Sequence, residues 1–124
     1  MFAALALVLM GQGVAAAGRS DIEAMRIAER QKALAAWESC TLGNASRLAR
    51  GNAEPAATIA DAALGLCADG ERDYRRWTNE IVKVLDNSWE YANQQTATMR
   101  NEVRGRAIAA VIEQRSKAPT RRKR

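Results

Sequence analysis

Apolar side chains recur at steps of three and four residues along most of this chain, and this spacing constrains the fold more than any other feature. The first series runs through Ile22, Met25, Ala33, Trp37, Cys40, Ala45 and Leu48. The second runs through Ile59, Ala63, Leu66, Gly70, Tyr74, Trp77, Ile81, Leu85 and Trp89, and continues through Ala92, Thr96, Met99, Val103, Ala107 and Ala110. Such spacing puts apolar groups on one face of an α-helix. With only two prolines in the chain, the sequence predicts an all-α fold.

Helix boundaries can be predicted from capping and turn residues. Ser20 and Glu23 fit a capping box, which predicts a helix from Ser20 to about Arg50. Between residues 50 and 55, Gly51 is suited to end that helix and Asn52 to cap the next, while Pro55 is tolerated in its first turn.

The second helical region, residues 53–116, would be about 95 Å long as a single helix. A chain of 124 residues cannot easily cover such a rod, so we expect a break at Asp86-Asn87-Ser88 or near Gly70. Two architectures fit this pattern. One is a three-helix bundle, and the other is an antiparallel hairpin extended by a long third helix, which we favour.

The first seventeen residues have the order of a signal peptide. An uncharged apolar run, Phe2–Met10, is followed by the small residues Ala15, Ala16 and Ala17, and the first charged side chain is Arg19. We predict cleavage after Ala17 or one residue earlier, and a periplasmic or secreted protein. No basic residue precedes the apolar run, so an uncleaved anchor is the alternative. The predicted organisation is a signal peptide (1–17), a helical domain (18–116) and a basic tail (117–124).

Export changes the interpretation of the two cysteines, because a cysteine pair in an oxidising compartment usually forms a disulfide. The midpoint of Cys40 and Cys67 falls within the predicted turn, so the two residues stand at matching heights in an antiparallel hairpin. The same rule pairs Leu48 with Ile59 and Ala45 with Ala62. It also sets the large residues Trp37 and Tyr74 opposite the small residues Gly70 and Ala33. The sequence therefore predicts a structural Cys40–Cys67 disulfide. A redox-active pair is disfavoured because there is no C-x-x-C motif.

The net charge of +5 belongs to the end of the chain. Five cations lie in the last eight residues, while the other 116 residues carry 14 basic and 14 acidic groups. Four adjacent cations at the end, Arg121, Arg122, Lys123 and Arg124, are candidates to contact an anionic envelope surface. Nucleic acid is the alternative partner if the chain is not exported. A solubilising end without a partner is equally compatible with the composition.

The composition argues against most catalytic chemistry. The chain has no histidine, which excludes Ser-His-Asp and Cys-His catalysis and removes the commonest metal ligand. Neither a P-loop nor a G-x-G-x-x-G motif occurs. The acidic segment from Asp69 to Asp73 superficially matches a calcium loop, but Tyr74 stands where that loop needs glycine. We therefore expect no enzyme activity, no cofactor and no metal. The catalytic alternative is a carboxylate hydrolase using Asp61, Asp69 or Glu71, although the spacing of these residues singles out no pair.

The remaining clusters have plain structural explanations. We expect the arginines to lie on solvated faces with local ion pairs; they are Arg72, Arg75 and Arg76 beside Trp77, and Arg100, Arg104 and Arg106. Trp37, Trp77 and Trp89 are expected to pack in the core, although Trp89 or Tyr91 should face outward after the break. Asn44-Ala45-Ser46 is a formal glycosylation sequon.

The pattern of Trp37 and Cys40, then Glu54 and Pro55, then Cys67 resembles small exported bacterial proteins without an assigned activity. The sequence thus favours a non-catalytic binding or structural protein of the cell envelope. Its partner would be an unknown protein, or a second copy bound through the apolar helix stripe.

Overall fold

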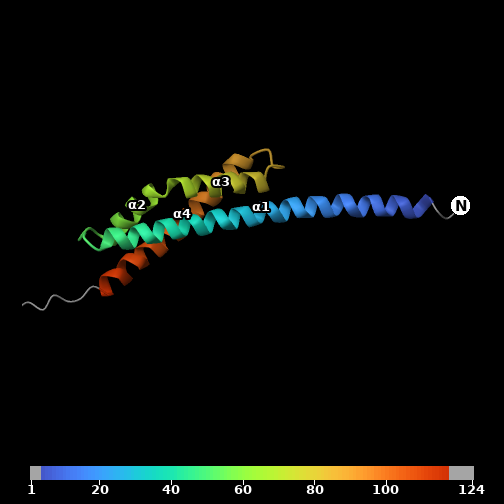
Figure 1. Ribbon diagram of the computed structural model, residues 1–124. Helices are drawn as coiled ribbons and strands as arrows, with labels where there is room; N and C mark the ends of the chain where they lie inside the picture. The colour runs from blue at the N-terminus through green and yellow to red at the C-terminus, as the bar shows by residue number, and fades with distance from the viewer. Residues whose placement is uncertain (1–3, 118–124) are drawn as a thin grey trace, which may run out of the picture.

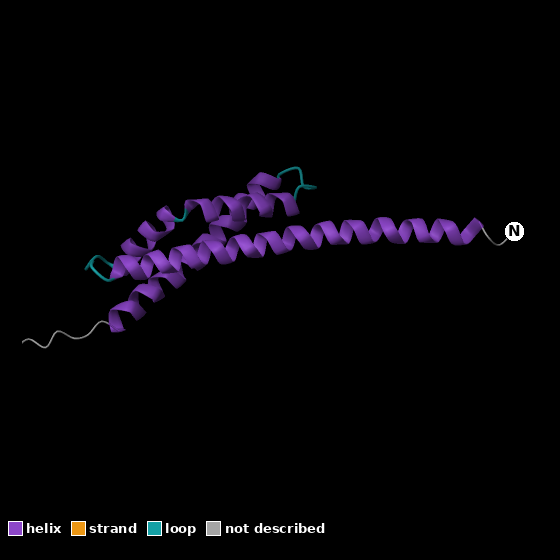
Figure 2. Ribbon diagram, viewed as in Figure 1, coloured by secondary structure: helices purple, strands orange, loops and turns teal. Residues whose placement is uncertain are grey.

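Four helices make up nearly all of residues 4–117, which are the residues that the computed structural model describes (Figure 1). They are α1 (Ala4–Ala49), α2 (Ala56–Leu66), α3 (Ala68–Ile81) and α4 (Ser88–Lys117). Figure 2 shows helices and connecting loops, and no strand, in this part of the chain. The predicted all-α class is confirmed. Helix α1 packs against each of the other three helices, and α4 also packs against α2 and α3.

Helix α1 is much longer than predicted. Its 46 residues correspond to about 69 Å, and its amino-terminal half projects beyond the other helices (Figure 1). The helix runs through Ser20 without interruption, so the predicted capping box at Ser20 is wrong. The residues before it are rich in alanine and leucine, which favour helix. Residues 4–17 of the predicted signal peptide lie within α1, while residues 1–3 lie outside the described residues.

The turn between α1 and α2 occupies the predicted place but uses different contacts. The Glu54 backbone N–H donates to Asn52 Oδ1 at 2.9 Å, which closes a local turn and leaves Asn52 outside the helix. Helix α2 begins three residues later than predicted, after Pro55, whose carbonyl accepts the Ile59 N–H at 3.2 Å. No glycine in the described residues has a positive φ, so Gly51 does not end α1 in the left-handed conformation.

The second helical region breaks twice. Cys67 is the only residue between α2 and α3, and there the Cys67 N–H bonds the Leu64 carbonyl while the Gly70 N–H bonds the Cys67 carbonyl, both at 3.1 Å. These tight i→i+3 bonds bend the chain at Cys67. The other break lies between Ile81 and Ser88, as one alternative predicted. Gly70 itself lies inside α3.

Two apolar clusters form the core. The one near the α1–α2 turn is built mostly of small residues: Ala45, Ala49, Ile59, Ala60, Ala63, Ala107 and Val111. The other surrounds Trp37 and includes Leu64, Cys67, Tyr74 and Val103. The predicted pairing of Trp37 with Gly70 is confirmed, since a Cβ added at Gly70 would lie 2.8 Å from the Trp37 Cβ. Glycine is required there because α3 approaches α1 so closely.

Three fully buried threonines contribute hydroxyl groups to this core. Thr41, Thr78 and Thr96 lie on α1, α3 and α4 respectively. Each donates its hydroxyl hydrogen to the carbonyl four residues earlier in its own helix, at 2.7–2.8 Å. A buried hydroxyl without a partner would be costly, so these internal bonds let threonine occupy positions that otherwise favour apolar residues.

The predicted disulfide is present in the structure. It joins Cys40 of α1 to Cys67 at the α2–α3 junction, with the two Cα atoms 5.9 Å apart. The bond closes a segment with a sequence separation of 27 that contains the α1–α2 turn and all of α2. It therefore ties the bend of the second helical region to the middle of α1.

Candidate functional site

Exposed apolar side chains concentrate at one end of the helical bundle. Two segments contribute seven of the nine large apolar residues that are exposed among the described side chains: Ile22, Met25 and Ile27 from α1, and Val84, Leu85, Trp89 and Tyr91 from the α3–α4 loop and the start of α4. Val84 is 92% exposed. We call residues 22–27 together with residues 82–91 the loop end of the bundle. Patches of this kind mark binding surfaces more often than isolated apolar residues do.

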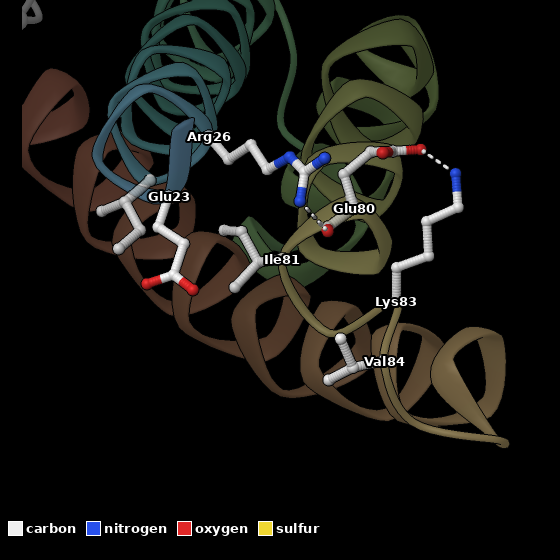
Figure 3. A pocket seen from close by; sticks show the side chains of 7 residues that line it. Glu23, Arg26, Glu80, Ile81, Lys83 and Val84 are labelled. Atoms are coloured by element: carbon white, nitrogen blue, oxygen red, sulfur yellow. Dashed lines mark hydrogen bonds and ion pairs between the residues drawn. The ribbon is translucent and has the colours of Figure 1, made fainter. Parts of the chain in front are cut away.

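A pocket of about 270 Å³ adjoins the loop end, between α1 and the end of α3. Its walls combine apolar and charged side chains: Glu23, Arg26, Ile27, Glu80, Ile81, Lys83 and Val84. Figure 3 shows Arg26 reaching from α1 to the Glu80 carbonyl, where its Nη1 donates at 3.4 Å. Lys83 Nζ lies 3.4 Å from Glu80 Oε1. The two acidic and two basic residues balance, so the pocket has no net preference for an anionic ligand.

Trp89 and Tyr91 are both exposed, at 56% and 38%. The sequence predicted that one of them would face outward after the break, and the structure places both there. Trp37 is buried as expected and Trp77 is partly buried. The prediction that Trp89 packs in the core is therefore wrong, because the loop before α4 changes the direction in which the helical stripe faces.

The carboxylates considered for a hydrolase are each held by an arginine. Arg104 Nε donates to Asp61 Oδ1 at 2.7 Å, Arg100 Nη1 contacts both oxygens of Glu71 at 2.9–3.0 Å, and Arg72 pairs with Asp69. The hydrogen bond from Arg104 lowers the pKa of Asp61. A carboxylate with a lowered pKa is a poor general acid or base near neutral pH. All three carboxylates are thus paired with arginines of the same chain.

Arg100, Arg104 and Arg106 connect α4 to the three other helices. Their partners are Glu71 on α3, Asp61 on α2 and Glu38 on α1. The sequence suggested solvated faces with local ion pairs, and it missed these three partners because they lie 29, 43 and 68 positions away. The arginines are therefore engaged with acidic groups of the same chain.

The arginines beside Trp77 form the local pairs that the sequence predicted. Arg75 lies 3.8 Å from Glu71, Arg76 lies 3.8 Å from Asp73, and the Arg76 guanidinium stands 5.6 Å from the centre of the Trp77 ring. These contacts place basic groups among the acids of the calcium-like segment. Within the described residues, no group of three or more potential ligand side chains could hold a metal ion.

The candidate contacts in the tail, Arg121, Arg122, Lys123 and Arg124, lie outside the described residues. The preceding cation, Lys117, pairs with Glu113 on α4 at 2.9 Å. None of the helices within residues 4–117 is long and apolar enough to cross a membrane.

The chain matches no family model, no curated protein and no solved structure. Its function must therefore be argued from its own residues and geometry.

The Asp61–Arg104 pair predicts a pH-dependent contribution to stability. Because the folded state lowers the pKa of Asp61, this contribution is fully present above the ordinary value of 3.8 and is lost as the pH falls through the lowered folded value. We expect Arg104→Met to lower the melting temperature at pH 6 and low salt, and to lower it less at pH 2. In an Asp61→Asn background, Arg104→Met should lose this pH dependence. An effect equally large at both pH values would contradict the prediction.

Proposed function

We propose that this protein is an exported, non-catalytic binding protein of the cell envelope and that the loop end of the bundle contacts a protein partner. The observation that carries the proposal is the concentration of exposed apolar side chains at this end, with Val84 at 92% and Trp89 at 56% exposure. Exposed aromatic residues are typical anchors of protein interfaces. The balanced charges around the adjacent pocket favour a protein partner over an anionic surface.

The ion pairs of the carboxylates support a non-catalytic role. Asp61, Asp69 and Glu71 each face an arginine, and the sequence contains no histidine. We also propose that α1 against α2 and α3 acts as a disulfide-braced antiparallel hairpin, extended by α4 as the long third helix. In this arrangement the hairpin and α4 hold the α3–α4 loop in place for contact with the partner.

Export is supported by the order of residues 2–17 and by the cysteine pair. We expect protein isolated from its native cells to begin at Gly18 or one residue earlier, as measured by amino-terminal sequencing and intact mass. A mature chain that still carries Phe2 would overturn the export proposal. The alternative of an anionic surface bound through the tail stays a prediction, because Arg121–Arg124 lie outside the described residues.

The contact surface can be tested by placing a photo-crosslinking residue at position 84 in cells. We expect one predominant crosslinked protein, and we expect Trp89→Asp to reduce its yield about tenfold or more, because truncated aromatic anchors cost about 2 kcal/mol or more. A crosslinking residue at Ile112, which is also exposed but lies outside the loop end, is the matched control.

The same crosslinked species from position 112, or an unchanged yield in Trp89→Asp, would contradict the proposal. A product of twice the chain's mass would identify a second copy as the partner. Circular dichroism of Trp89→Asp should show unchanged helix content, because the Trp89 side chain lies outside both core clusters.

A further inference from the structure

The two sulfurs of the disulfide have different surroundings. Cys40 lies on an exposed face of α1, whereas Cys67 is 3% exposed and joins α2 to α3. A thiolate in solution therefore reaches Cys40 more easily than Cys67. In thiol–disulfide exchange, the sulfur that is attacked and the sulfur that leaves are different atoms. The difference in exposure therefore favours attack on Cys40, with Cys67 as the leaving group.

The amide nitrogen of Asn44 lies within hydrogen-bonding distance of both sulfurs, and the sulfur of Cys67 is the nearer one. Its Nδ2 lies 3.4 Å from Cys67 Sγ and 3.6 Å from Cys40 Sγ, and it also donates to the Cys40 carbonyl at 2.9 Å. Asn44 reaches the bond because it is four residues after Cys40 on the same helix face. Arg47 Nη2 donates to Asn44 Oδ1 at 2.8 Å, which fixes the orientation of the amide and polarises its N–H groups toward the sulfurs.

We propose that the Cys40–Cys67 disulfide is a site of exchange with a small thiol, in which Cys40 is attacked and Cys67 leaves. The incoming thiolate forms a new S–S bond to Cys40 Sγ. Cys67 Sγ departs with the electron pair of the broken bond, as a thiolate that accepts a hydrogen bond from Asn44 Nδ2. A second thiolate then attacks the reductant's sulfur in the mixed disulfide and releases Cys40. After both cysteines take up protons, the protein has gained two thiols and the two reductant thiols have become one disulfide.

The charges near Cys67 permit a thiolate there. Cys67 stands at the amino end of α3, which favours a thiolate, and at the carboxyl end of α2, which opposes one, so the two helix ends offset each other. The first turn of α3 carries Asp69 and Glu71, but both are paired with arginines, Asp69 with Arg72 and Glu71 with Arg100 and Arg75. Burial of Cys67 opposes the charge, so the N–H donors of Asn44 are the groups that offset this cost.

Opening the bond changes the constraint on the Trp37 cluster. Cys67 belongs to this cluster together with Tyr74, and the rings of Trp37 and Tyr74 lie 5.8 Å apart. Without the bond, the α2–α3 junction has no cross-link to α1 and is held there by packing and by the contact of Asn44 with Cys67. Reduction should therefore alter the near-ultraviolet circular dichroism of the buried aromatic residues, and the exchange site becomes a redox-responsive link between α1 and the junction.

Exchange kinetics and adduct mapping test the proposal on the folded protein. Wild type, Asn44→Ala and the neighbouring control Ser46→Ala are treated with 2-mercaptoethanol, quenched with acid and mapped by mass spectrometry. We expect the mixed disulfide on Cys40 in wild type. We also expect opening to be about tenfold slower or more in Asn44→Ala, because the departing thiolate loses a charge-assisted hydrogen bond, and unchanged in Ser46→Ala. Asn44→Asp keeps the side-chain shape but lacks the N–H donors, so it should be slowed at least as much.

The direction of the change separates this role from a structural one. If Asn44 only stabilised the fold, its loss would loosen the protein and make opening faster. Faster or unchanged opening in both Asn44 variants would overturn the proposal, as would an adduct found mainly on Cys67. Reduction without any change in the near-ultraviolet signal would overturn the proposed link to the Trp37 cluster.

Discussion

A Cys40→Ala/Cys67→Ala double variant should have a free energy of unfolding about 3–4 kcal/mol lower than that of the oxidised wild type, on the chain-entropy model. The bond closes a segment with a sequence separation of 27, so its loss returns considerable conformational freedom to the unfolded chain. Urea unfolding followed by circular dichroism measures the difference. Both alanines are small enough to fit the space that the sulfurs occupy.

Reduced wild type is the matched comparison for the double variant. It keeps both cysteine side chains and lacks only the covalent bond, so the two proteins should unfold at similar urea concentrations. Coincident unfolding of oxidised and reduced wild type would contradict the prediction, because it would show that the bond adds nothing to stability.

Substitutions at Gly70 should cause the other large loss of stability. A Cβ at this position would lie 2.8 Å from the Trp37 Cβ and 2.9 Å from its Cα. Neither atom can move without shifting α1. We expect Gly70→Ala to lower the free energy of unfolding by about 1–3 kcal/mol, as overpacked core positions do, and Gly70→Val to lower it further. Thermal unfolding of the oxidised protein would measure both changes.

Gly105→Ala is the matched control for Gly70. Gly105 also lies inside a helix, but a Cβ added there would have no neighbour within 4 Å. Because alanine favours helix by about 1 kcal/mol over glycine, Gly105→Ala should stabilise the protein. If Gly70→Ala also stabilised the protein, helix propensity would outweigh the contact with Trp37 and the prediction would be wrong.

Several contacts were predicted by the rule that residues equally distant from the turn face each other in an antiparallel pair of helices. Leu48 and Ile59 share one cluster, and Ala33 packs against the cluster that contains Tyr74. The rule was wrong by one residue at Ala62, which is exposed while Ala63 is buried. A later start of α2 than predicted changes which alanine faces α1.

The apolar spacing predicted the wrong buried residues where the helix is interrupted. It predicted Leu66 in the core, yet Leu66 is 60% exposed and Leu64 is 1% exposed. The bend at Cys67 interrupts the helical period, and a stripe counted through that bend selects the wrong face. Spacing alone could not place the bend, because it depends on tertiary contacts of α2 and α3 with α1.

The candidate site could be predicted only in part. The expected break predicted that one of Trp89 and Tyr91 faces outward, whereas both are exposed, and the loop end as a surface also needs Ile22 and Met25 of α1. These residues would have been assigned to the core because their spacing continues the buried stripe. They are exposed because α3 ends at Ile81 and does not extend over them. No local sequence signal predicted that α3 ends there.

The buried threonines have a consequence for helix alignment. Because Thr41, Thr78 and Thr96 each bond a carbonyl of their own helix, these hydroxyls would stay satisfied if one helix slid a full turn along its neighbour. Their hydrogen bonds therefore do not fix the position of one helix along another. The specific contacts that align the helices are the close approach of Gly70 to Trp37, the disulfide at Cys67 and the ion pairs of the α4 arginines. A substitution that releases one of these points therefore removes part of what fixes the positions of the helices along one another.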